Sequence, residues 1–144
     1  MEMVSCYTEN VPFEVGEVLK KIGFWDPRCT YSCNYNGPCY FSGSKKFYGD
    51  GMVAPWEEIV PAPTYAEVID WFVNTKNIII ILDPFFTYSL RDHIAYNWKI
   101  YYLDGEKNLI LVTENDEYTS DKGYGGSFKL TANDAIMRAA KIQN

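Results

Sequence analysis

His93 is the single histidine of the chain, so any mechanism that needs an imidazole must use this residue. Asp92 precedes it and Ser89 lies four residues earlier, but the chain has no G-x-S-x-G motif to present a serine nucleophile. Asp83 follows an apolar run, at the carboxyl end of a predicted strand, where sites of α/β sheets occur. Asp before Pro is also an ordinary strand terminator. The sequence therefore predicts no catalytic residue and leaves a hydrolase-like enzyme using Asp83 or His93 as one alternative.

Thiol chemistry and metal binding would have to use four cysteines, Cys6, Cys29, Cys33 and Cys39. A structural zinc site prefers two close pairs separated by a longer loop, whereas here the spacings are C-x3-C and C-x5-C with a distant fourth residue. We expect free thiols in a reducing compartment, with a zinc site and a disulfide as the weaker alternatives. We predict no metal and no cofactor.

Phosphate and calcium chemistry would have to use the polar segment Glu114–Gly126. Its glycines, at 123, 125 and 126, lack the Lys-Ser/Thr ending of a P-loop, and its acids do not have the spacing of a calcium loop. The formal net charge is -6, and the basic residues are scattered. Because phosphate backbones are bound by clustered Lys and Arg, we expect no nucleic-acid partner.

Aromatic side chains are the unusual feature of the composition, with 12 Tyr, 8 Phe and 4 Trp. Many lie in the segment of about 25–62, which has little periodicity and many Gly and Pro turn signals. A long irregular segment in a small domain is often functional. Packing of large side chains in a small core and on the sheet is one explanation, and a recognition surface is the alternative. Any binding residues are expected in this segment; the candidates are Trp25, Tyr35, Tyr40, Phe41 and Trp56.

The elements that must position these residues centre on the segment 63–82. Thr64 and Glu67 have the spacing of a capping box, which predicts a helix beginning there. The uninterrupted apolar run Ile78–Leu82 predicts a strand covered on both faces, in the middle of the sheet. Asp83-Pro84 is expected to end that strand, and a second, weaker strand is expected to follow.

The remaining elements have clear local signals. An apolar stripe predicts a helix over about 12–22, with Gly16 allowing a close contact and Gly23 as a left-handed cap. Short strands are expected at 30–35 and 39–41. Alternation over 95–103 predicts a strand with Tyr96, Trp98, Ile100 and Tyr102 on one face, a hairpin at 104–107 and an antiparallel return over 108–113. A second capping box over 131–134 predicts the last helix.

Together these elements predict one α+β domain over residues 1–144. It has a small, mainly antiparallel sheet of three to five strands, packed by two or three helices. A long irregular, aromatic-rich region separates the first helix from the second.

Four blocks carry a resemblance to a known group: VGEVLKKIGFWDPRC, APTYAEVIDWFVNTKNIIIIL, YNWKIYYLDG and ANDAIMRAAKI. In this order they resemble small uncharacterised proteins encoded by phages and prophages of gut Bacteroidetes, with PTYAEVIDWF as the best-matching block. Residues 42–59 and 114–126 lie outside the match. The resemblance implies a phage-related origin and an α+β fold, and it transfers no site.

The sequence favours a non-enzymatic protein-interaction module, an accessory protein of phage or prophage type. With no secretory signal and no long apolar run, we expect a cytoplasmic location, a protein partner and no membrane contact. A homo-oligomer stays open, because edge strands can pair between copies. The main alternative is a small-molecule or nucleotide-binding domain with an aromatic-lined pocket.

Overall fold

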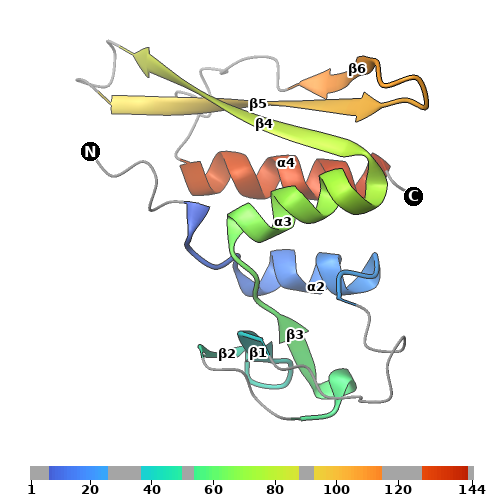
Figure 1. The fold of residues 1–144 in the computed structure, drawn as a ribbon. Coiled ribbons are helices and arrows are strands. Elements are labelled where there is room, and N and C mark those ends of the chain that lie inside the picture. The colour runs from blue at the N-terminus through green and yellow to red at the C-terminus, as the bar shows by residue number, and fades with distance from the viewer. Residues whose placement is uncertain (1–6, 26–36, 50–53, 88–92, 115–127, 143–144) are drawn as a thin grey trace. The chain divides into compact units, whose positions relative to one another are not determined.

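The computed structural model describes residues 7–25, 37–49, 54–87, 93–114 and 128–142. Its contacts group into two compact units, an N-terminal unit of Met3–Glu67 and a C-terminal unit of Val68–Asn144. Helices and antiparallel sheets occur together in the chain, which confirms the predicted α+β class (Figure 1). The grouping into units does not test the expectation of a single domain, which stays a prediction.

The N-terminal unit contains a small antiparallel sheet where an irregular segment was expected. Strand β1 (Cys39–Phe41) pairs with β2 (Lys46–Tyr48) on one side and with β3 (Ile59–Pro61) on the other. The short 3-10 helix η2 (Trp56–Glu58) leads into β3. Of the two strands expected here, the one over 39–41 is confirmed, and the one over 30–35 lies outside the described residues.

Helix α2 (Phe13–Lys21) packs against β3 through a glycine. A Cβ atom built on Gly16 would overlap the carbonyl oxygen of Pro61 and lie 2.8 Å from Cγ1 of Val60. Gly23 has a φ of 94° after the last turn, and the amide of Phe24 donates to the carbonyl of Leu19 at 2.9 Å. The close contact at Gly16 and the left-handed cap at Gly23 are therefore both confirmed.

Helix α3 (Tyr65–Trp71) begins with the predicted capping box. The amide of Glu67 donates to Oγ1 of Thr64 at 3.2 Å, and the amide of Thr64 donates to Oε1 of Glu67 at 2.9 Å. The helix continues into a π-helical segment, η3 (Phe72–Lys76), which ends at Asn77 in the left-handed conformation. The boundary between the two units falls within α3.

The C-terminal unit is a three-stranded antiparallel sheet, within the described residues, with one long helix packed on it. Strands β4 (Ile78–Thr87), β5 (His93–Leu103) and β6 (Leu109–Glu114) lie in the order β4-β5-β6. Helix α4 (Phe128–Ile142) lies along one face of this sheet and contacts β4 and β5 (Figure 1). Its buried alanines at 132, 135, 139 and 140 let it approach the strands closely.

The position predicted for the isoleucine run is wrong. β5 is the middle strand, and β4 lies at one border of the sheet. Ile78, Ile80 and Leu82 are buried, whereas Ile79 and Ile81 between them are only half-buried, so one face of the strand is covered rather than both. An unbroken run of apolar residues does not by itself report how many faces of a strand are packed.

The predicted strand end at Asp83-Pro84 is also wrong, because β4 continues without a break to Thr87. Pro84 lies opposite Tyr96 of β5 in the ladder. A proline has no amide hydrogen to donate, and this loss is tolerated on a border strand, where one side of the backbone has no neighbouring strand to pair with. The border position of β4 thus explains the presence of Pro84.

The second capping box, predicted over 131–134, is wrong as well. Helix α4 begins one turn earlier, at Phe128. The side chains of Thr131 and Asp134 form hydrogen bonds with strand β5 instead of capping the helix. Oγ1 of Thr131 donates to the carbonyl of Tyr96 at 3.2 Å, and Nε1 of Trp98 donates to Oδ2 of Asp134 at 2.8 Å. These polar side chains fix α4 to the sheet rather than starting the helix.

Candidate functional site

Strand β6 exposes four consecutive apolar side chains. Leu109, Ile110, Leu111 and Val112 have exposed fractions of 56, 48, 46 and 42%, respectively. Single exposed apolar residues are ordinary on protein surfaces, but a contiguous group on one strand marks an interaction surface or an aggregation risk. We call these four residues the β6 patch.

Both faces of β6 contribute to the β6 patch. Leu111 lies opposite Tyr101 and, beyond it, Ile79, so these three form an apolar row across the sheet. Ile110 lies opposite Tyr102 on the other face, the face that bears Ile100. Tyr102 was predicted to share a face with Trp98 and Ile100, and unlike these two buried residues it is 42% exposed. A register shift after Ile100 leaves one extra residue in β6, which is the pattern of a β-bulge.

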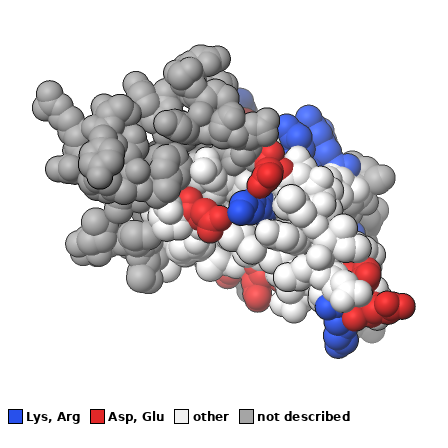
Figure 2. All heavy atoms as spheres, turned by 90° about the horizontal axis from the view of Figure 1, so that it is seen from above, with Lys and Arg blue, Asp and Glu red and all other residues white. Residues whose placement is uncertain are grey.

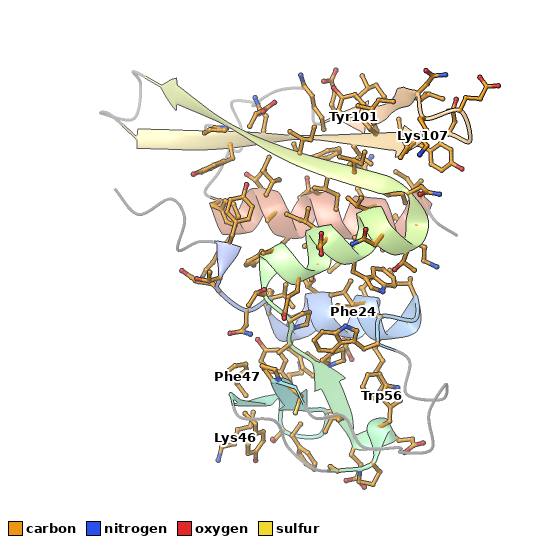
Figure 3. The ribbon with its side chains drawn as sticks, in the orientation of Figure 1. Phe24, Lys46, Phe47, Trp56, Tyr101 and Lys107 are labelled. Atoms are coloured by element: carbon orange, nitrogen blue, oxygen red, sulfur yellow. The ribbon has the colours of Figure 1, made fainter. Side chains whose placement is uncertain are left out.

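Charged side chains lie at the ends of the β6 patch rather than within it. Figure 2 views the sheet from the side opposite α4 and shows acidic and basic side chains gathered in groups, with uncharged side chains between them. Between Leu109 and Thr113 the strand has no charged residue and no proline. Lys107 precedes this apolar stretch and Glu114 ends it. Figure 3 shows Lys107 and Tyr101 near the β5–β6 hairpin.

The position of β6 is fixed by a turn built on Asp104, as the predicted hairpin requires. Oδ1 of Asp104 accepts hydrogen bonds from the amides of Glu106 at 2.8 Å and Asn108 at 2.9 Å. The amide of Asp104 donates to the carbonyl of Asn108, and that of Lys107 donates to the carbonyl of Asp104. The hydrogen bond from Asn108 is the main reason that the pKa of Asp104 lies below its ordinary value.

We expect the β5–β6 turn to loosen in acid. Because the pKa of Asp104 is lower in the folded chain than its ordinary value of 3.8, the stabilisation is fully present above that value and is lost as the pH falls through the lowered one. Hydrogen exchange at the amides of Glu106 and Asn108 should accelerate over that range. Asp104→Ala should show the fast exchange at all pH values, and Asp104→Asn, which keeps an acceptor oxygen, should lose the pH dependence. Identical exchange in wild type and Asp104→Ala would contradict this role.

The predicted binding residues lie in the N-terminal unit, and most of those described make structural contacts. The hydroxyl of Tyr40 donates to the carbonyl of Val11 at 2.6 Å, and its ring contacts those of Phe13 and Phe47. Burial of the hydroxyl, together with the charge of Glu14, raises the pKa of Tyr40. Phe41, its neighbour on β1, is half-buried.

Trp56 is held in place from helix α2. Nζ of Lys20 donates to the carbonyls of Trp56 and Ile59, at 2.7 Å each, and lies 4.9 Å from the centre of the Trp56 ring. The ring packs against a buried cluster that includes Cys39 and Ile59. Burial lowers the pKa of Lys20, against the opposite effect of Glu57 and Glu17. Trp56 is therefore half-buried by structural contacts (Figure 3).

Trp25 is 37% exposed, the most of the predicted binding residues that are described. Its ring packs edge-on against the ring of Phe24, with 4.6 Å between the ring centres. Tyr35 lies outside the described residues. Phe47, on β2, is 43% exposed and was not predicted. Whether this group binds a ligand stays a prediction.

The two candidate catalytic residues lie apart along the sheet. Asp83 pairs with Asn97, and His93 occupies a position on β5 four residues from Asn97. At about 3.4 Å per residue, these four residues separate the two backbone positions by about 14 Å along the sheet, too far for a direct hydrogen bond. Ser89 and Asp92 lie outside the described residues.

The part of the chain that the structure describes was searched for metal-binding groups and for membrane-spanning helices. It contains no group of three or more His, Cys, Asp or Glu arranged to hold a metal ion. Cys39 is buried, and the other three cysteines lie outside the described residues. No described helix combines the length and the apolar character that crossing a bilayer requires.

Comparison with family models, with curated proteins and with solved structures found no match for this chain. The choice of the β6 patch as the candidate site therefore rests on its exposure and its position in the sheet. Sequence reasoning placed a strand over 108–113 but did not identify it as a surface. The available signal was the run Leu-Ile-Leu-Val, which lacks the alternation of a strand with one face in water.

Proposed function

We propose that this chain is a non-enzymatic protein-interaction module that binds a protein partner through strand β6. The observation that carries the proposal is the β6 patch, four successive apolar side chains that are each at least 42% exposed. Burying such side chains against a partner contributes about 25 cal/mol per Å² of apolar area, before the costs of association. A phage or prophage origin, which rests on the sequence resemblance, and the cytoplasmic location expected from the sequence pattern are part of the proposal.

The mode of binding that fits β6 is strand addition. β6 has β5 as its neighbour on one side, and no other described strand lies on its outer side. In strand addition the backbone amides and carbonyls of such a border strand supply affinity, and side chains alternating on its two faces supply specificity. The β6 patch offers apolar groups on both faces. A partner is therefore expected to present an extended segment with apolar side chains.

The test compares the immobilised wild-type chain with two variants in a bacterial lysate. Leu111→Lys places a charge in the β6 patch, and Leu130→Lys places the same charge on α4, where Leu130 is 67% exposed. We expect a protein retained by the wild type and by Leu130→Lys, with at least tenfold less retained by Leu111→Lys. Titration with the purified partner should reproduce this order. If no retained protein distinguishes the two variants, the proposed function fails.

A further inference from the structure

The four border strands of the two sheets differ in how they resist pairing with another chain. β3 is three residues long, is buried and ends in Pro61. β2 is three residues long and has exposed Lys46 at its start. β4 carries Asp83 and Pro84 within the strand. Short length, charge and proline are the devices by which natural border strands avoid unwanted pairing. β6 is six residues long and has neither a charge nor a proline before Glu114, and its bulge is the one protective feature that it carries.

β6 is thus the described border strand that is suited to pairing. From this contrast we propose that the β6 patch is covered by a second copy of this chain, with the two β6 strands antiparallel about a twofold axis. The proposal rests on the proposed function and names the kind of partner. A twofold contact uses the same surface on both copies, so every requirement on the partner must be met by β6 itself.

β6 meets these requirements. Its centre is uncharged, so apolar side chains of one copy face apolar side chains of the other, and the two Leu111 side chains lie near the axis. Lys107 lies before the strand and Glu114 at its end. Antiparallel pairing brings the Lys107 end of one copy toward the Glu114 end of the other, whereas parallel pairing would place like ends together. Glu106, beside Lys107, reduces this charge effect, so the apolar contact is the main contribution.

The arrangement also predicts the strength and size of the assembly. Pairing of one six-residue strand, with the side chains around it, makes a small interface, for which a micromolar Kd is expected. The twofold axis closes the assembly at two copies, because each copy uses its only β6. The joined sheet has six strands, with a β4 at each border. Because β4 contains Asp83 and Pro84, further pairing at these borders is disfavoured.

Sedimentation equilibrium of the purified chain tests the inference without a partner protein. Between about 1 µM and about 100 µM, the mass of the wild type should rise from 16.6 kDa toward twice that value. Leu130→Lys should behave as the wild type, and Leu111→Lys should stay monomeric, with a Kd raised at least tenfold. If Leu111→Lys does not fold by circular dichroism, Leu109→Lys replaces it.

Three results would overturn the inference: a monomeric wild type throughout, dimers of the β6 variant as stable as those of the wild type, or growth beyond two copies. The inference and the proposed function fail in different ways. A monomeric chain that retains a partner through Leu111 overturns the inference alone. A chain that dimerises through β6 and retains no protein from the lysate overturns the proposed function alone.

Discussion

Gly16→Ala is expected to lower the free energy of unfolding by about 3 kcal/mol, the upper part of the range for overpacking a well-packed site. The added methyl group would overlap the carbonyl oxygen of Pro61 and approach Cγ1 of Val60. Backbone cannot move aside as a flexible side chain can, so α2 and β3 would have to separate. Helix propensity alone predicts the opposite sign, because Ala is about 1 kcal/mol better than Gly within a helix. The direction of the change therefore decides between the two effects.

Denaturant unfolding followed by circular dichroism measures this change. Gly105→Ala is the matched control, since a Cβ at Gly105 meets no atom within 4 Å. Gly105→Ala should change the free energy of unfolding by no more than about 0.5 kcal/mol. A Gly16→Ala protein as stable as the wild type would show that α2 does not pack against β3 as closely as described.

Among substitutions in the C-terminal unit, Trp98→Ala is expected to have the largest effect on stability. It should lower the free energy of unfolding by about 4 kcal/mol. The side chain is 2% exposed, and its Nε1 donates to Asp134 of α4. Removing it leaves a cavity between β5 and α4 and removes a hydrogen bond that holds the two together. Leu130→Ala on the exposed side of α4 is the control and should change stability by less than about 0.5 kcal/mol.

A double-mutant cycle of Trp98→Phe and Asp134→Ala separates the energetic contribution of the hydrogen bond from that of the cavity. A coupling energy of about 1 kcal/mol is expected, because the two variants remove the same bond. Strictly additive effects would mean that this bond does not contribute to the docking of α4.

Local signals predicted the elements that depend on neighbours in sequence. The Thr64–Glu67 capping box, the Gly23 cap and the Asp104 turn each involve residues within five positions of one another, and all three are confirmed. The class of fold followed from the same signals. Such features need no information about distant parts of the chain.

Features that depend on distant residues were predicted less well. The run Ile78–Leu82 is as apolar as a central strand, and only its pairing with β5 alone shows that it lies at a border. Thr131 and Asp134 have capping-box spacing, but their partners are Tyr96 and Trp98, some 35 residues away in the chain. β3 was not predicted, because its three residues carry no periodic pattern and are defined by their partners in β1.

The candidate site also depends on residues that are distant in sequence, and it was predicted less well than the local features. Aromatic content pointed to Trp25, Tyr40, Phe41 and Trp56, yet aromatic rings are used as readily for packing, and Tyr40 and Trp56 are tied to the carbonyl of Val11 and to Lys20. The β6 patch was missed because its composition is that of a buried strand. Its exposure follows from its border position and from the place where α4 packs, neither of which is local in sequence.

Hydrogen exchange of the wild-type chain tests most directly whether a second copy covers β6. Exchange at the amides of Leu109–Glu114 is compared at about 1 µM and about 100 µM, with Lys46–Tyr48 of β2 as the internal reference. We expect the β6 amides that face outward to exchange at least tenfold more slowly at the higher concentration, while the β2 amides stay unchanged. Equal β6 exchange at both concentrations, or equal slowing in β2, would contradict the account.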